Sequence, residues 1–103
     1  MSSRAPVPCP EMTDIRNQID ALDKRLVALL ADRQKLISAA GRVKPNRDTV
    51  RDEARIEEVI KLVLAEAERT GLARQIAEPL WRQLIESSIA YEYEVFDERP
   101  ESD

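Results

Sequence analysis

Histidine is absent from this 103-residue chain, and cysteine, glycine and aromatic residues are scarce. Without histidine the commonest general base is missing, so any reaction catalysed here would have to proceed without it. The single cysteine, Cys9, excludes a disulfide within the chain and favours a reducing compartment. No apolar run approaches the roughly 18 residues of a membrane span. The first ten residues lack the apolar segment of a signal peptide, so we expect a cytoplasmic protein.

Positive charge is in deficit as well, because the formal net charge is −4. A nucleic-acid-binding protein would carry a basic face, so that class is disfavoured, and any anion site must be a local cluster of cations. Apolar residues make up 43% of the chain and charged residues 35%, which is typical of an all-helical domain. Two or three long helices bury little surface alone, so we expect association. We place the domain at 11–97, between a flexible, proline-broken tail at 1–10 and an acidic tail at 98–103.

Helical spacing of apolar residues predicts an all-α fold, with helices over about residues 12–44, 49–70 and 74–97. In the first helix the apolar positions recur at alternating steps of four and three, the pattern of a packed helix seam. These positions are Ile15, Ile19, Leu22, Leu26, Leu29, Leu36 and Ala40.

Proline, glycine and capping residues mark where these helices begin and end. Pro45 disfavours further helix after the first. Asp48 or Thr49 can cap the second helix, and Gly71 is a suitable residue to end it. Gly41, inside the first helix, costs about 1 kcal/mol relative to alanine, and the close approach of another backbone or of a ligand would explain it.

Arg33 interrupts the apolar seam between Leu29 and Leu36. A guanidinium cannot lose its charge, so an anion should meet it if it is buried. Lys44 lies further along the helix, within about 20° of the same face and about 16 Å away along the axis. Arg16 lies about 25 Å before Arg33 on another face. It could therefore serve the same pocket only from a second, antiparallel copy of the helix.

Each of these polar residues also has an ordinary structural interpretation. Arg33 could be a snorkelling side chain or one half of a dimer salt bridge, and Arg16 a surface charge. Lys44 suits the negative end of a helix dipole. An ordinary structural interpretation also exists for an acid and its neighbour early in the second helix, and for two polar residues one turn apart in the third. These four are Asp52, Arg55, Ser88 and Glu92. The functional interpretation therefore rests on their joint arrangement.

The first helix carries the sequence IRNQIDALDKRLVALLADRQKLISAAGRVK, and Ser88 and Glu92 follow in the third. With these motifs, residues 15–96 resemble the all-helical chorismate mutases and the related isochorismate pyruvate lyases. Arg16, Arg33 and Lys44 fall on the three cations of that family. The resemblance implies an intertwined homodimer of three-helix chains, six helices in all. Each of its two sites would be completed by Arg16 of the partner subunit.

Two positions depart from the mutase pattern. Many mutases carry Gln at the position of Glu92, whereas some carry Glu. Beside a doubly negative substrate, burial and nearby anions favour a protonated glutamate, which could donate to the ether oxygen as the amide does. The loop after Lys44 is one residue shorter than in the bacterial mutase used for comparison. When the alignment allows for this gap, Asp52 and Arg55 match the family. Ile56 then stands where a mutase usually has a Glu that helps hold the ring hydroxyl, and an apolar residue there is seen in the lyases.

The resemblance implies the pericyclic rearrangement of chorismate to prephenate, a step of aromatic amino acid biosynthesis that needs no base, metal or cofactor. Arg33 and Arg16 of the partner subunit would each hold a carboxylate of the small dianionic substrate. Lys44 and a protonated Glu92 would donate to the ether oxygen, and Asp52 would hold the ring hydroxyl. The other predicted substrate-binding residues are Arg55, Ile56 and Ser88.

Two further interpretations stay open. An isochorismate pyruvate lyase would form salicylate and pyruvate on the same scaffold. Ile56 favours the lyase, whereas Ser88 and Glu92 favour the mutase. The alternative from another class is a non-catalytic helical dimer, either a regulatory module or a partner of another pathway enzyme, which the acidic tail could contact.

Overall fold

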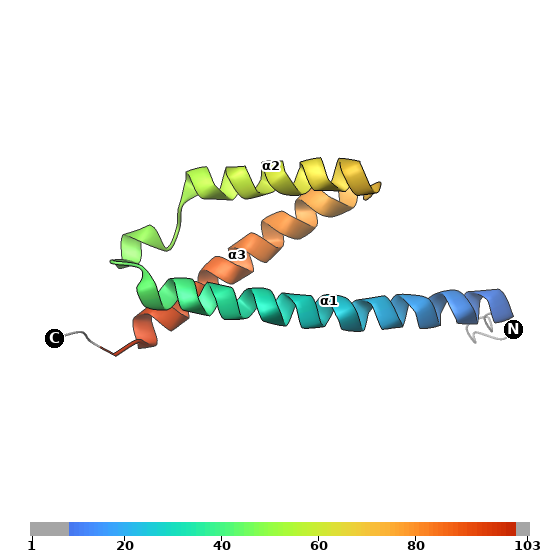
Figure 1. Cartoon of the computed structure of the whole chain (residues 1–103), viewed down its shortest axis with the longest axis horizontal. Coiled ribbons are helices and arrows are strands. Elements are labelled where there is room, and N and C mark those ends of the chain that lie inside the picture. Colours follow the sequence, from blue (N-terminus) through green and yellow to red (C-terminus); the bar gives the residue numbers. More distant parts are fainter. Residues whose placement is uncertain (1–8, 101–103) are drawn as a thin grey trace, which may run out of the picture. The chain divides into compact units, whose positions relative to one another are not determined.

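The chain folds as three long helices joined by short connections (Figure 1). The computed structural model describes residues 9–100, and most of the two predicted tails, residues 1–8 and 101–103, lies outside this range. The elements are α1 (Pro10–Val43), the 3-10 turn η1 (Arg47–Thr49), α2 (Glu53–Thr70) and α3 (Arg74–Glu98). Residues 9–100 contain no strand, so the predicted all-α fold with three helices is confirmed. Within the same range, no helix is long and apolar enough to cross a membrane.

The chain divides into two compact units at Arg33, inside α1. In the first unit the structure describes the N-terminal part of α1, and the apolar seam of this helix is exposed. Its five large seam residues are between 47% and 64% exposed. They are Ile15, Ile19, Leu22, Leu26 and Leu29. An apolar stripe of this length on one helix is typical of a surface that packs against another element.

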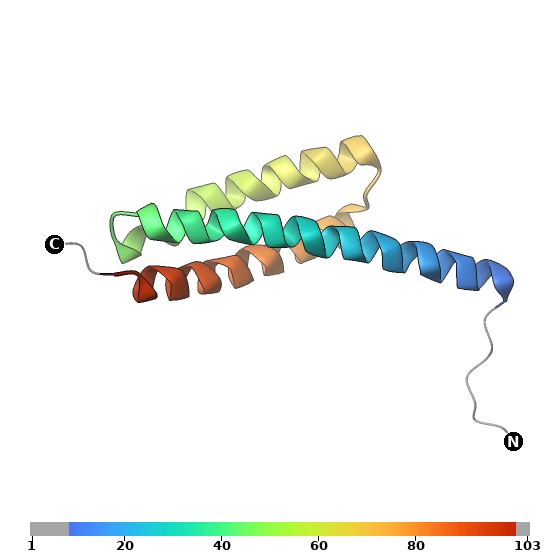
Figure 2. The ribbon, with the colours of Figure 1, turned by 60° about the horizontal axis from the view of Figure 1, so that its bottom comes forward.

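In the second unit, from Gln34 onward, α2 and α3 run antiparallel and pack around a small isoleucine core (Figure 2). Ile56 and Ile60 of α2 lie against Ile85 of α3, and none of the three is more than 7% exposed. Partly buried apolar residues surround them, namely Val59, Leu64, Trp81 and Ile89. Burying each isoleucine side chain contributes about 1.5–3 kcal/mol, so this core holds α2 on α3.

The second helix begins later than the sequence indicates, because its N-cap is Asp52. The Asp52 carboxylate accepts a hydrogen bond from the backbone N–H of Arg55 at 3.0 Å, the contact that stabilises a helix start. The predicted caps, Asp48 and Thr49, both lie in η1. There the Thr49 hydroxyl donates to the carbonyl of Asn46 at 2.7 Å. The prediction of a cap at Asp48 or Thr49 is therefore wrong.

The predicted ends of the first two helices are confirmed to within one residue. α1 ends at Val43, two residues before Pro45. α2 ends at Thr70, and Gly71 follows with a φ of 84° in the left-handed region. The N–H groups of Gly71 and Leu72 both donate to the same carbonyl of the last helical turn, at 2.9 Å. A side chain disfavours this backbone conformation, which is why glycine stands here.

Gly41 lies where the last turns of α1 pack on α3, both within the second unit. A β-carbon built at Gly41 would lie 3.1 Å from the backbone oxygen of Glu92 and 3.1 Å from Cγ1 of Val95. The oxygen belongs to a helix backbone, which cannot shift independently of its neighbours. Of the two explanations offered for Gly41, another backbone or a ligand, the structure shows the close approach of another backbone.

Replacing Gly41 with leucine should lower the free energy of unfolding by about 1–3 kcal/mol, because the new side chain must displace α3 at Glu92. Urea unfolding followed by circular dichroism, at one protein concentration, measures the change. Arg42→Leu is the matched control, because residue 42 is exposed on the same helical turn. If both variants were equally stable, the close packing of α1 on α3 at residue 41 would be disproved.

Candidate functional site

Lys44 and Glu92 form the centre of the candidate site. Lys44 directly follows α1, and Glu92 lies in the C-terminal part of α3. The ammonium Nζ of Lys44 is 2.5 Å from Oε2 of Glu92. The same ammonium donates a hydrogen bond to the backbone carbonyl of Val50 at 3.2 Å. The end of α1, the connection before α2 and the helix α3 therefore meet at one cation.

Glu92 is the one buried charged residue among those that the structure describes, with 4% of its surface exposed. Burying a carboxylate costs several kcal/mol unless a partner offsets its charge. Lys44 is that partner, and its own side chain remains 26% exposed. Within the described residues, the Oε2 atom of Glu92 has no partner besides the Lys44 ammonium. The site thus holds a buried acid paired with a cation that solvent still reaches.

Three local features of the sequence bring this pair together. Pro45 ends α1, so the Lys44 side chain leaves the helix at its C-terminus. Gly41 lets α1 approach the α3 backbone at Glu92 itself. Val50, only 3% exposed, anchors the connection so that its carbonyl faces Lys44.

Ser88 and Ile56 occupy different surroundings in the second unit. Ser88 is half-buried, one helical turn before Glu92 on α3. Ile56 packs in the isoleucine core with Ile60 and Ile85, so its side chain already has apolar neighbours from both helices. Ser88 and Glu92 are therefore one turn apart on α3, as the sequence predicts.

Asp52 and Arg55 make contacts at the start of α2. The Asp52 carboxylate caps the helix through the Arg55 N–H. The Arg55 guanidinium forms an ion pair with Glu58, one turn further along the exposed face of α2. A carboxylate has about four lone-pair sites, so the capping bond leaves Asp52 able to accept further hydrogen bonds.

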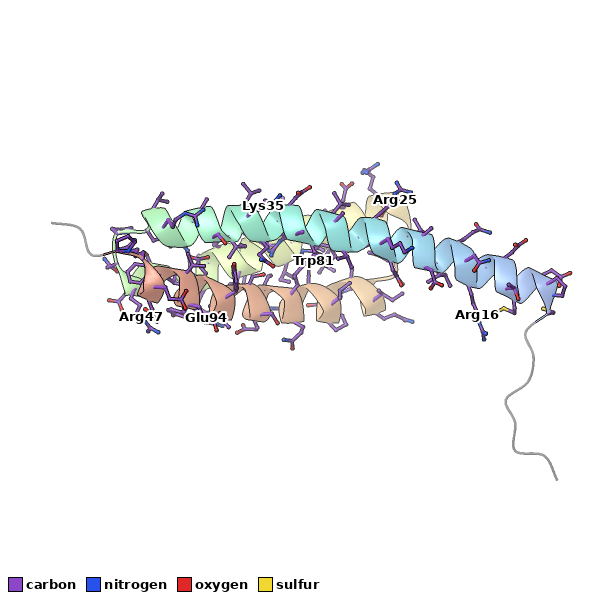
Figure 3. All side chains as sticks on the ribbon, turned by 90° about the horizontal axis from the view of Figure 1, so that it is seen from below. Arg16, Arg25, Lys35, Arg47, Trp81 and Glu94 are labelled. Carbon is purple, nitrogen blue, oxygen red and sulfur yellow. The ribbon has the colours of Figure 1, made fainter. Side chains whose placement is uncertain are left out.

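Arg16 and Arg33 both lie in the first unit, on α1. Arg16 is exposed, and its side chain extends away from the helix near its beginning (Figure 3). Arg33 is half-buried and takes part in a contact. The continuous helix between them is about 25 Å long, more than a small molecule can span. The two arginines of one chain therefore cannot both contact the same small ligand.

Two surface arginines of the second unit form ion pairs with α3 or across the two helices, Arg51 from the connection before α2 and Arg82 from α3 itself. Arg51 donates to Glu86 at 2.9 and 3.0 Å, and Arg82 donates to Glu57 at 3.1 Å. These hydrogen bonds hold the pKa of Glu86 and of Glu57 below the ordinary value. Exposed pairs of this kind stabilise a fold only slightly. Residues 9–100 contain no cluster of three or more acidic, cysteine or histidine side chains that could bind a metal ion.

The carbonyl of Val50 is the contact to Lys44 that sequence reasoning missed. A backbone acceptor has no side-chain signature, so its role depends on how the connection folds. The available signal was Val50 itself, an isolated apolar residue in a polar stretch after Pro45. Such a residue is often buried, and this one is.

Comparisons with known proteins give two matches. A family model described as "Chorismate mutase type II" matches residues 15–93, a span that includes every predicted site residue. The T-protein of Haemophilus influenzae is 31% identical over 90 residues. That alignment covers 79% of this chain and 22% of the T-protein, so the chain spans less than a quarter of its relative.

Proposed function

This chain belongs to the chorismate mutase type II family, and on that premise we propose that it converts chorismate to prephenate. The observation that carries the proposal is the pair of Lys44 and Glu92, a cation and a buried acid in contact where α1 packs on α3. The reaction breaks a C–O bond and forms a C–C bond within one molecule. It requires a held conformation and stabilised charge rather than a base or nucleophile, which suits a chain without histidine.

Lys44 has the chemistry needed at the breaking bond. Negative charge grows on the ether oxygen in the transition state, so a donor placed there binds the transition state more tightly than the substrate. The Lys44 ammonium is fixed by Glu92 and by the Val50 carbonyl, and it still reaches solvent. Removing one such donor from an enclosed site costs about 2.7–4 kcal/mol of transition-state stabilisation.

Glu92 is proposed as the second donor. In the substrate-free chain its carboxylate balances the charge of Lys44. A bound dianion adds negative charge at this point, which favours proton uptake by Glu92. A protonated Glu92 carboxyl has one O–H group, which it could donate in a hydrogen bond to the ether oxygen.

The two substrate carboxylates are assigned to Arg33 and to Arg16 of the partner subunit. The distance between these arginines along one helix supports supply from two chains. The exposed apolar seam of the first unit supports a homodimer, because a second copy with the same seam could cover it. In this assembly Asp52 would hold the ring hydroxyl, and Ser88 would assist a carboxylate. Arg55 and Ile56 would complete the substrate-binding set.

Isochorismate pyruvate lyase is the alternative that Ile56 suggested. The matched family model is described by the mutase reaction, and the packing of Ile56 in the isoleucine core gives this residue a structural reason to be apolar. The lyase is therefore not favoured. A cytoplasmic location and association with another pathway enzyme stay predictions.

Incubation with chorismate and, separately, with isochorismate tests the proposed function. We expect prephenate from chorismate, and no salicylate from isochorismate beyond the uncatalysed background. Product chromatography distinguishes the outcomes. Salicylate as the main enzymatic product would assign the chain to the lyase reaction, and turnover of neither compound would leave the non-catalytic dimer.

Glu92 as a protonated donor makes the rate depend on pH. We expect kcat/KM to rise as the pH falls from about 8 to about 5, because only the protonated carboxyl can donate. Glu92→Gln should flatten this profile, since an amide donates at every pH. Initial rates across this pH range measure the effect.

Glu94→Gln is the matched control for this experiment. Glu94 lies on the same helix but is exposed, so the profile of this variant should follow that of the wild type (Figure 3). A pH profile unchanged in Glu92→Gln would remove Glu92 from the donor role.

Supply of Arg16 by the second chain can be tested by mixing two inactive variants. In a mixed dimer of Arg16→Ala and Arg33→Ala, one of the two sites keeps both arginines. Random mixing of equal amounts should therefore restore about a quarter of the wild-type sites. Activity measured after unfolding and refolding the mixture gives the recovery. Each variant unfolded and refolded alone is the control and should stay inactive, and no recovery in a verified Arg16→Ala/Arg33→Ala mixed dimer would rule out supply between chains.

A further inference from the structure

Arg99, directly after α3, reaches across to the end of α1. Its Nη1 atom donates to the carbonyl of Lys44 at 2.7 Å, with longer contacts of 3.2 Å to Arg42 and 3.4 Å to Gly41. The last carbonyls of a helix lack partners within it and carry the negative end of the helix dipole. The Arg99 guanidinium therefore satisfies this end of α1 and ties the backbone of Lys44 to α3.

Phe96 holds the Arg99 side chain in place. The guanidinium carbon lies 3.8 Å from the centre of the Phe96 ring, a cation–π contact with a planar cation on an aromatic face. The backbone N–H of Arg99 also donates to the Phe96 carbonyl at 3.3 Å. Because Arg99 is half-buried and fixed at both its backbone and its guanidinium, few other positions are open to it.

A second arginine, in the connection that follows α1, contacts the same C-terminal part of α3. Arg47 donates to Asp97 at 3.0 Å, and its guanidinium carbon lies 4.4 Å from the centre of the Tyr93 ring. This pair is more exposed than the Arg99 contacts, and it attaches η1 rather than the last carbonyls of α1. Of the two arginines, Arg99 is therefore the one that bonds directly to the backbone of Lys44.

Both the backbone and the side chain of Lys44 are thus held, one by the residue that follows α3 and the other by α3 itself. Its carbonyl bonds to Arg99, and its ammonium contacts Glu92. The position of the ammonium depends on where the backbone of residue 44 lies. Misplacing a catalytic group by about 1 Å can cost about 100-fold in rate.

We propose that Arg99 is a positioning residue, which sets the place of the Lys44 ammonium by capping the end of α1. This inference rests on the proposed mutase function for its kinetic consequences. Its structural content, that Arg99 holds the backbone at Lys44, does not depend on the reaction.

The test compares Arg99→Gln with Arg69→Gln. Arg69 is the matched control, because it is an exposed arginine near the C-terminus of α2 whose ion pair is with Glu66 on its own helix. We expect Arg99→Gln to lower kcat by about 10- to 100-fold and to change KM little, since the Lys44 donor acts in the transition state. Arg69→Gln should keep the wild-type values of both.

Phe96→Leu separates positioning from charge. This variant removes the surface under the guanidinium but leaves every charge in place. It should lower kcat in the same direction as Arg99→Gln, by a smaller factor. If Arg99 acted only through its positive charge, Arg99→Gln would raise KM with kcat unchanged, and Phe96→Leu would behave as the wild type. Either result would overturn the proposal, and Phe96→Leu decides the question if Arg99→Gln does not fold.

Amide hydrogen exchange gives a readout that needs no turnover. The N–H of Lys44 donates to the carbonyl of Ala40 at 3.0 Å, and its exchange reports opening at the end of α1. Arg99→Gln should speed its exchange by at least about tenfold while amides in the middle of α2 keep their rates. Unchanged exchange at Lys44 would overturn the proposal. Absence of turnover in the wild type would instead refute the mutase function, and the exchange result would still decide the role of Arg99.

Discussion

The ion pair between Lys44 and Glu92 lies where the end of α1 meets α3. A glutamate that is only 4% exposed is tolerated as a carboxylate only beside a partner, and the partner here comes from the end of another helix. The contact therefore requires α1 to end at one residue and to approach α3 within van der Waals distance. Pro45 meets the first condition and Gly41 the second.

The contacts around this pair make the end of α1 a rigid support. Arg99 donates to carbonyls at the end of α1 and to that of Lys44, and the Val50 carbonyl accepts from the Lys44 ammonium. Both contacts use backbone oxygens, so they hold Lys44 in place without neutralising its charge. In a chain with a net charge of −4 the protein as a whole does not attract an anion, and in the described residues the charge of Lys44 is balanced by Glu92.

The first unit poses a different physical problem. The side chains of Ile19, Leu22 and Leu26 are each about half exposed, so within the described residues this apolar surface is not buried against another element. A second copy would bring a like seam against it and, in the proposed assembly, would carry Arg16 to Arg33. Association and the supply of a substrate-binding cation would then be two consequences of one helix surface.

The sequence by itself determined the three helices, their ends at Pro45 and Gly71, and the close approach at Gly41, because these depend on local spacing and backbone conformation. It also singled out Lys44 and Glu92, through the family pattern. It placed the start of the second helix wrongly, because Asp48, Thr49 and Asp52 can all cap a helix and only the folded connection decides among them. The pairing of Lys44 with Glu92 and the bond from Arg99 to the end of α1 join residues about half the chain apart. Only the packing of α1 on α3 decided these contacts, since no local preference reaches across that distance.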